Sequence, residues 1–164
     1  MNIVLIGFMG CGKTTVGLEL SKAKGMVFVD ADKLTERKLS LPVKSIFDYY
    51  GQRFFRLIEK ETILEISKLE NCVISIGGGA FINKANIEVL KRSGIVIFLK
   101  GSIETIIKNI DGNDSPLLRG RELSEIIDLY TSRLSFYKEA HKEIYIDGLT
   151  SAEIANEIIH CLKI

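Results

Sequence analysis

The sequence predicts an α/β fold in which helices cover both faces of a parallel five-stranded sheet, forming a three-layer sandwich. Two observations support this prediction. Five short runs of apolar and β-branched residues are spaced along the chain, and segments with helical periodicity separate them. Parallel strands need such helical crossovers. Strands covered on both faces are nearly continuous in apolar residues, as these runs are.

Each expected strand is a run of three to five residues. The runs are residues 3–6, 26–29, 72–76, 95–99 and a weaker one at 144–146. Two of the intervening helices are outlined by apolar side chains three or four residues apart, which fall on one helical face. These side chains are Ile103, Ile106, Ile107 and Ile110 in one helix, and Ala155, Ile158, Ile159 and Leu162 in the other. Thr150 and Glu153 predict a capping box at the start of the second.

Composition and charge limit the possible classes of protein. The chain has 164 residues, 46% of them hydrophobic and 26% charged, so we expect one domain over residues 1–164 with a substantial core. Its formal net charge of +1 does not favour binding to nucleic acid or to a membrane surface. No apolar run approaches membrane-spanning length. Three cysteines, Cys11, Cys72 and Cys161, lack metal-ligand spacing and cannot all pair, which favours free thiols and a cytoplasmic location.

A phosphate-binding motif directly follows the first strand. Residues 7–14, G-F-M-G-C-G-K-T, match the pattern G-x-x-x-x-G-K-[ST] at every fixed position. Glycines let backbone N–H groups surround a phosphate, and the following helix adds its positive N-terminal end. We expect the Lys13 ammonium to lie against the β- and γ-phosphates and the Thr14 hydroxyl to be a ligand for Mg²⁺. The motif predicts binding of a nucleoside triphosphate with Mg²⁺.

Two aspartates mark the end of the second strand. Asp30 and Asp32 alternate, so we expect their carboxylates to share one strand face and leave the sheet together beside the phosphate loop. One would hold Mg²⁺ through water and the other would accept a proton from a substrate hydroxyl. The alternative is that an aspartate here caps the next helix. Two carboxylates at this spacing favour the functional interpretation.

Arg56 and Glu59 are three residues apart and would be neighbours on a helix. The spacing alone favours an exposed ion pair of little energetic value. In the alternative interpretation, Glu59 orients Arg56 to bind a carboxylate with two parallel hydrogen bonds.

A glycine triplet follows the third strand, at Gly77, Gly78 and Gly79. It is either a flexible turn or a place where a ligand approaches bare backbone, and its position at the end of a central strand favours the ligand. The strand carries Ser75 where many phosphate-loop proteins have an acidic metal ligand. Metal binding would therefore fall to Thr14 and Asp30. Residues 111–121 are polar and aperiodic, which predicts a functional loop or lid.

These motifs, taken in order, resemble the shikimate kinase family from residue 3 to about residue 160. The resemblance rests on the phosphate loop, the Asp-x-Asp pair, Phe-Arg-x-x-Glu, the glycine triplet, a Pro-Leu-Leu lid and Arg133-x-x-x-Tyr137. It implies the nucleoside-monophosphate-kinase-like P-loop fold with strand order 2-3-1-4-5 and a mobile lid. It also implies Mg-ATP-dependent phosphoryl transfer to the 3-hydroxyl of shikimate, in aromatic amino-acid biosynthesis.

The resemblance also implies roles for individual residues. Lys13 would contact the transferring phosphate, Asp32 would hold the shikimate hydroxyls and act as the base, and Arg119 would act from the lid. Thr14 would bind Mg²⁺ directly and Asp30 through water. The implied ATP site comprises Gly10, Cys11, Gly12, Lys13, Thr14, Thr15 and, against the adenine, Lys108. The implied substrate site, whose main region is residues 32–60, comprises Asp32, Arg56, Gly77, Gly78, Gly79 and Arg133, with the two arginines on the carboxylate.

One position departs from the family pattern. The family lid reads Arg-Pro-Leu-Leu, whereas Ser115 precedes the proline in this chain. Either Arg119 or Arg121 replaces the missing cation, or the lid closes differently, or catalysis is weakened. The alternative functions are another small-metabolite kinase such as a gluconate kinase, a nucleoside-monophosphate kinase, and an ATP-binding protein with impaired catalysis. The expected partners are ATP and shikimate, with no nucleic acid or membrane, and the expected state is a monomer.

Overall fold

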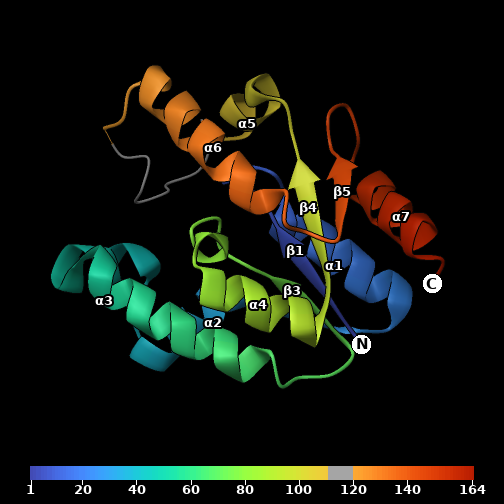
Figure 1. Ribbon diagram of the computed structural model, residues 1–164, viewed down its shortest axis with the longest axis horizontal. Helices are drawn as coiled ribbons and strands as arrows, with labels where there is room; N and C mark the ends of the chain where they lie inside the picture. Colours follow the sequence, from blue (N-terminus) through green and yellow to red (C-terminus); the bar gives the residue numbers. More distant parts are fainter. Residues whose placement is uncertain (111–119) are drawn as a thin grey trace.

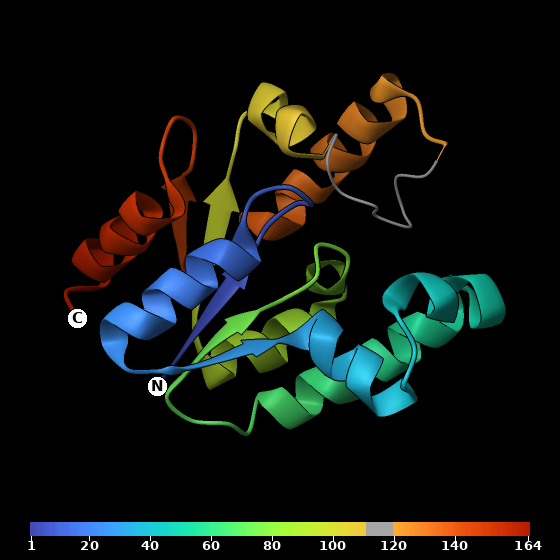
Figure 2. The same cartoon turned by 180° about the vertical axis from the view of Figure 1, so that it is seen from behind.

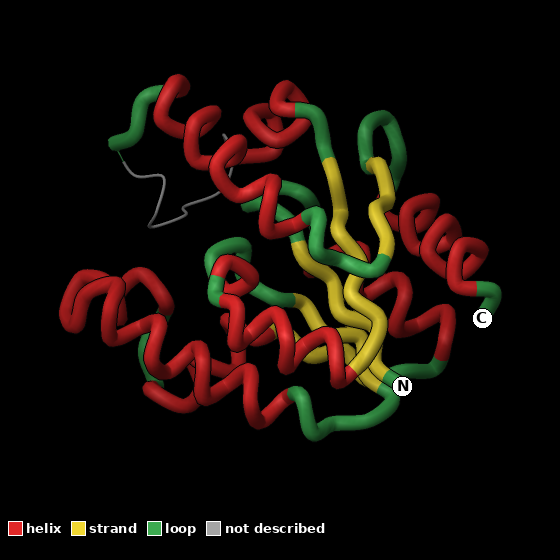
Figure 3. The backbone as a smooth tube through the Cα atoms, in the orientation of Figure 1, coloured by secondary structure: helices red, strands yellow, loops and turns green. Residues whose placement is uncertain are grey.

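The protein contains one parallel sheet whose strands run in the order β2-β3-β1-β4-β5 (Figures 1 and 3). This is the order that the family resemblance implied. The computed structural model describes residues 1–110 and 120–164. The strands are β1 (Asn2–Ile6), β2 (Val27–Asp30), β3 (Cys72–Ser75), β4 (Gly94–Lys100) and β5 (Lys142–Tyr145).

Helices cover both faces of this sheet, so the predicted three-layer sandwich is confirmed. Helices α1 and α7 pack together on one face, and α4 covers the other, with α3 packed outside α4 and against α2 (Figures 1 and 2). The helices are α1 (Lys13–Lys24), α2 (Ala31–Leu39), α3 (Val43–Ile66), the short 3₁₀ helix η1 (Ala80–Ile82), α4 (Lys84–Ser93), α5 (Ile103–Ile110), α6 (Leu123–Tyr137) and α7 (Ser151–Leu162).

The strands occupy the predicted places, but their ends differ by one or two residues. Strand β2 runs from Val27 to Asp30 because it continues to pair with β3 until Asp30 meets Ser75. Strands β1 and β3 are buried throughout, as expected for the centre of the sheet. At the edge of the sheet, Val27 is 63% exposed, because an edge strand has a neighbour on one side only.

Local signals near the helices are confirmed as well. Thr150 and Glu153 form the predicted capping box at α7, in which the Thr150 N–H donates to Glu153 Oε2 at 2.7 Å.

Helix α3 contains a kink at Gly51, whose φ of 80° and ψ of 167° are not helical. All three cysteines are unpaired. None of the helices in the described ranges is both long and apolar enough to cross a bilayer.

Most of the predicted lid, residues 111–121, lies outside the described residues, and so do Ser115 and Arg119. Arg121 belongs to the described part and is exposed just before α6.

Candidate active site

The phosphate loop joins the end of the buried strand β1 to the start of α1. Gly10 and Gly12 have φ values of 78° and 79°, a left-handed conformation that other residues adopt at a cost. Gly12 caps α1, and Lys13 is the first residue of that helix. The Lys13 ammonium turns back over the loop and donates to the carbonyls of Gly7 and Phe8, each at 3.0 Å. The loop therefore has the backbone form that the motif predicts.

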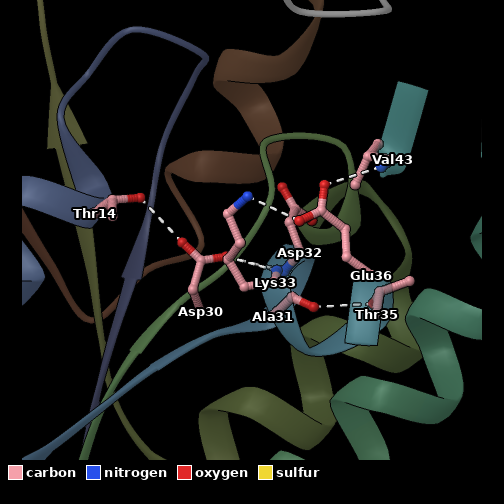
Figure 4. Close-up of polar contacts among 8 residues, drawn as sticks. All are labelled: Thr14, Asp30, Ala31, Asp32, Lys33, Thr35, Glu36 and Val43. Carbon is pink, nitrogen blue, oxygen red and sulfur yellow. Dashed lines mark hydrogen bonds and ion pairs between the residues drawn. The ribbon is translucent and has the colours of Figure 1, made fainter. Parts of the chain in front are cut away.

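Thr14 and Asp30 meet beside this loop, at the carboxyl end of the sheet (Figure 4). The Thr14 hydroxyl donates to Asp30 Oδ2 at 3.0 Å. The other oxygen of Asp30, Oδ1, accepts from the N–H groups of Asp32 and Lys33 at 3.0 and 3.2 Å and so caps α2. Asp30 is thus both a helix cap and a neighbour of the phosphate-loop threonine, whereas the sequence favoured only the second of these.

The expectation that Asp30 and Asp32 share a strand face is wrong. Strand β2 ends at Asp30, and Asp32 lies in the first turn of α2, because the Asp30 cap starts the helix there. The helical turn sends the two carboxylates in different directions, Asp30 toward Thr14 and Asp32 toward Gly77.

Oxygen donors suited to Mg²⁺ are present at Thr14 and Asp30. Mg²⁺ prefers hard oxygen ligands and is usually held by one or two protein groups, with waters and substrate phosphates completing its shell. A threonine hydroxyl and a carboxylate beside a phosphate loop fit this pattern. In residues 1–110 and 120–164 there is no group of three or more acidic, histidine or cysteine side chains that would form a metal cage. The two residues therefore fit an ion that is shared with phosphates.

Asp32 is partly buried at the side of a cavity on the carboxyl edge of the sheet. Burial, reinforced by the charge of Asp30, raises the pKa of Asp32 to about 6, while Lys13 and Arg56 oppose the rise. The carboxylate is therefore ionised at neutral pH and is a stronger base than an ordinary aspartate.

Helix α2 is joined to α3 by Glu36, whose carboxylate accepts from the Val43 N–H at 2.9 Å (Figure 4). The two helices also share a hydrogen bond between the Thr35 and Thr62 hydroxyls, at 3.3 Å. These contacts hold the helix that carries Asp32 against the helix that carries Arg56.

Arg56 is bound by Glu59 on the inner face of α3. Arg56 Nη1 donates to both carboxylate oxygens of Glu59 at 2.7 Å, and Glu59 is only 2% exposed. The prediction of an exposed ion pair, which the spacing alone favoured, is therefore wrong, because tertiary packing buries this face of α3. Burial raises the pKa of Glu59 to about 7, although the Arg56 guanidinium opposes the rise. Glu59 thus holds the Arg56 guanidinium in a fixed orientation.

Arg133, on α6, is buried without hydrogen-bond partners for part of its guanidinium. It is 4% exposed, and its Nε and Nη1 atoms have no partner among the described residues. The guanidinium lies over the Phe8 ring, 5.5 Å from its centroid. Burial lowers the pKa of Arg133, and the charge of Arg56 lowers it further. Such a cation is costly unless an anion binds it.

The predicted substrate residues line one cavity of about 100 Å³. Its walls are formed by Met9, Asp32, Val43, Phe47, Phe55, Arg56, Glu59, Gly77, Gly78, Gly79 and Arg133. Motif reasoning missed the apolar members Val43 and Phe47, because nothing distinguishes them from core residues in the sequence. Met9 lies within the phosphate motif, at a position where the pattern allows any residue.

The glycine triplet leaves room for side chains of the cavity. A Cβ atom at Gly77 would lie 2.8 Å from Asp32 Oδ1, and one at Gly79 would overlap the Arg56 guanidinium. The sequence favoured room for a ligand at this turn. The contacts present are with protein side chains, so the glycines allow Asp32 and Arg56 to reach the cavity.

A second cleft, of about 330 Å³, lies on the other side of the phosphate loop. Lys108 lines it together with Cys11, Gly12 and Thr15, so four of the predicted ATP residues meet there. Further lining residues that the motifs did not indicate are Thr105, Asn109, Gly148, Leu149 and Ser151. They come from α5, from the loop before α7 and from the first residue of α7, and no local pattern marks them.

Comparison with known proteins agrees with this arrangement. A family model described as shikimate kinase matches residues 9–163. The shikimate kinase of Moorella thermoacetica is 43% identical over 163 residues, which covers 99% of this chain and 94% of that protein. The chain belongs to the shikimate kinase family. As a member of the shikimate kinase family, it is an ATP-dependent kinase.

Solved structures extend the shikimate kinase comparison to three dimensions. A shikimate kinase from Acinetobacter baumannii in complex with shikimate has a TM-score of 0.93 at 33% identity, covering 99% of this chain and 92% of that one. A gluconokinase from Sinorhizobium meliloti has a TM-score of 0.65 at 19% identity, covering 99% and 91%. The likeness to the gluconokinase is one of fold alone.

Proposed function

We propose that this chain is a shikimate kinase that transfers the γ-phosphoryl group of ATP to the 3-hydroxyl of shikimate. The observation that carries the choice of substrate is the buried Arg133 guanidinium, which lines the same cavity as Arg56 and whose Nε and Nη1 have no partner in the described part of the chain. Two guanidiniums in one small cavity suit a compact acceptor with a carboxylate. Family membership supports the same substrate.

On the nucleotide side, Gly10 to Thr15 bind the phosphates and Lys108 lies against the adenine. In this proposal the Lys13 ammonium leaves the carbonyls of Gly7 and Phe8, to which it donates at 3.0 Å, and binds the transferring phosphate. Thr14 holds Mg²⁺ directly and Asp30 holds it through water. When bound, the ion neutralises charge on the phosphates. Asp30 keeps Thr14 oriented through their 3.0 Å hydrogen bond.

On the acceptor side, Asp32 binds the shikimate hydroxyls and accepts the proton of the one that reacts. The hydroxyl oxygen forms a bond to the γ-phosphorus while the bond to the bridging oxygen breaks, and ADP leaves. A pKa of about 6 suits this role, because Asp32 is ionised at neutral pH yet basic enough to share a proton in the transition state. Arg56, Arg133 and the backbone of the glycine triplet, Gly77–Gly79, hold the carboxylate end of the substrate.

In the lid, which we propose to span residues 111–121, Arg119 supplies the cation that Ser115 lacks. Replacing Ser115 by Arg tests this assignment. If Arg119 already serves, the substitution leaves kcat within about twofold, whereas an unassisted lid would gain on the order of 10³-fold, the value of a phosphate-directed arginine.

Residues 1–164 form a single kinase domain in this proposal, and residues 32–60 form its substrate-binding region. The enzyme acts as a monomer in the cytoplasm, where the reducing medium suits the three unpaired cysteines.

A coupled ADP-release assay tests the proposed function. The purified chain is supplied with Mg-ATP and, in separate reactions, with shikimate, gluconate, a panel of nucleoside monophosphates, or no acceptor. Among these acceptors, we expect only shikimate to support ADP release, and we expect the Asp32→Asn variant to lose this turnover. Turnover with gluconate or a nucleoside monophosphate but not with shikimate would overturn the proposal. ATP binding without turnover on any acceptor would instead make the chain a nucleotide-binding protein.

A further inference from the structure

Tyr137, at the end of α6, makes a buried contact with the glycine triplet that the proposed mechanism does not use. Its side chain is fully buried, and its hydroxyl donates to the Gly78 carbonyl at 2.7 Å. The ring packs against Phe98, with the centroids 5.0 Å apart. Burial raises the pKa of Tyr137, so the hydroxyl remains a donor throughout the working pH range. The bond links α6 to the turn after β3.

The same contact brings Tyr137 next to the substrate arginine. Tyr137 follows Arg133 by four residues, so the two side chains share one face of α6. A Cβ atom at Gly78 would lie 3.2 Å from the Tyr137 hydroxyl and 3.4 Å from Arg133 Nη1. The Gly78 backbone, the Tyr137 hydroxyl and the Arg133 guanidinium therefore meet at one point on the cavity wall.

Fixing the Gly78 carbonyl also fixes a donor on the opposite side of the same peptide. In a trans peptide the C=O of one residue and the N–H of the next point in opposite directions. With its C=O held toward α6, this peptide directs the Gly79 N–H away from α6. That N–H has no backbone acceptor in the described part of the chain, and both glycines line the substrate cavity.

We infer that Tyr137 is a positioning residue for the acceptor site, because its hydroxyl holds the Gly78–Gly79 peptide, beside the Arg133 guanidinium, in the arrangement that receives the substrate carboxylate. The inference rests on the proposed function. Tyr137 is not among the residues that line the substrate cavity, so it acts through the peptide. Without its hydroxyl the Gly78 carbonyl is released, and the peptide rotates more freely.

Tyr130 provides a matched control on the same helix. It is 7% exposed, its hydroxyl donates to the Gly101 carbonyl at 2.6 Å, and its ring packs edge-on against Phe8 with a centroid distance of 5.2 Å. A phenylalanine substitution at either position removes one buried hydrogen bond between α6 and a glycine carbonyl. The Gly101 backbone adjoins Ile106 and Ile146 and does not line the substrate cavity.

The test compares the wild-type chain with Tyr137→Phe and Tyr130→Phe. The KM values for shikimate and ATP and the thermal midpoint are measured for each. We expect both variants to lose similar thermal stability. Tyr137→Phe should raise the KM for shikimate about tenfold, which corresponds to the loss of one good hydrogen bond, and leave the KM for ATP within about twofold. Tyr130→Phe should leave both KM values within about twofold.

Two results would overturn the inference while leaving the proposed function intact. One is an unchanged KM for shikimate in a folded Tyr137→Phe variant. The other is an equal rise in both variants, which would indicate general loosening of α6. If wild-type enzyme does not phosphorylate shikimate, the proposed function fails and the inference fails with it. If Tyr137→Phe does not fold, Gly78→Ala replaces it in the test, because the added methyl group would displace both Tyr137 and Arg133. An unchanged KM for shikimate in Gly78→Ala would overturn the inference.

Discussion

Replacing Arg133 by methionine is expected to stabilise the folded chain and, at the same time, to impair recognition of the acceptor. Arg133 is 4% exposed, and two of its guanidinium nitrogens have no partner within residues 1–110 and 120–164. Each buried, unsatisfied donor costs about 1–3 kcal/mol. Methionine fills a similar volume without a charge, so the substitution removes this cost.

The net gain in stability is small but measurable. At about 1.5 kcal/mol each, two unsatisfied donors cost about 3 kcal/mol. The guanidinium also lies over the Phe8 ring, at 5.5 Å, and losing that interaction at a desolvated site costs about 2 kcal/mol. The free energy of unfolding is therefore expected to rise by about 1 kcal/mol, which raises Tm by about 2–4 °C in a domain of this size.

The effect on the acceptor site has the opposite sign. Hydrogen bonds between charged groups contribute about 1.5–3 kcal/mol each. Loss of about 3 kcal/mol would raise the KM for shikimate about 100-fold. Thermal unfolding followed by circular dichroism and steady-state ADP release measure the two effects on the same preparation.

Arg56→Met is the matched control. It should weaken acceptor binding in the same way but destabilise the fold, because it leaves the buried Glu59 carboxyl without its hydrogen-bond and ion-pair partner. A lower Tm together with an unchanged KM for shikimate in Arg133→Met would refute the reasoning, since it would make Arg133 a structural residue.

Four further predictions concern Asp32, the glycine triplet and the metal ligand Thr14. Because the pKa of Asp32 is raised to about 6, kcat/KM for shikimate should fall on the acid side with a midpoint near pH 6; a midpoint below 5 would contradict this role. The folded state also binds this proton more tightly than the unfolded state, whose carboxyl titrates near 3.8, so Asp32 lowers stability as the pH rises from about 4 to 6. Asp32→Asn should make the measured decrease smaller and leave the part that comes from Glu59, whose pKa is raised to about 7. Gly79→Ala should displace the Arg56 guanidinium and raise the KM for shikimate while the fold is retained; an unchanged KM would show that Arg56 is not needed where it lies. Thr14→Val removes the hydroxyl that contacts Asp30 and should raise the Mg²⁺ concentration needed for half-maximal rate about tenfold or more, and an unaltered Mg²⁺ dependence would exclude Thr14 as a ligand.

Features governed by local backbone geometry could be predicted from the sequence. The left-handed glycines at positions 10 and 12 and the placement of Lys13 at the start of a helix follow from the motif itself. The capping box at Thr150 and Glu153 is likewise a contact between residues three apart. Such features need no knowledge of the rest of the fold.

Features that depend on tertiary packing could not be derived in this way. Asp30 ends its strand by capping α2, which places Asp32 on a helix and not on the strand where alternation suggested it would lie. The burial of Glu59 depends on what α3 packs against, which the three-residue spacing does not contain. The substrate role of Arg133 follows from the family resemblance and not from a local pattern. Its partner Tyr137 contacts Gly78 from 59 residues away in the sequence.

The most direct test of the proposed reaction is phosphorus-31 NMR of the wild-type chain incubated with Mg-ATP and shikimate. We expect the γ-phosphate signal of ATP to decline while ADP and one new phosphate monoester appear in equal amounts, with the monoester phosphorus coupled to the proton on carbon 3 of the ring. Release of ADP and inorganic phosphate without a new monoester, or a monoester at another hydroxyl, would contradict the assignment of this chain as a kinase of the shikimate 3-hydroxyl.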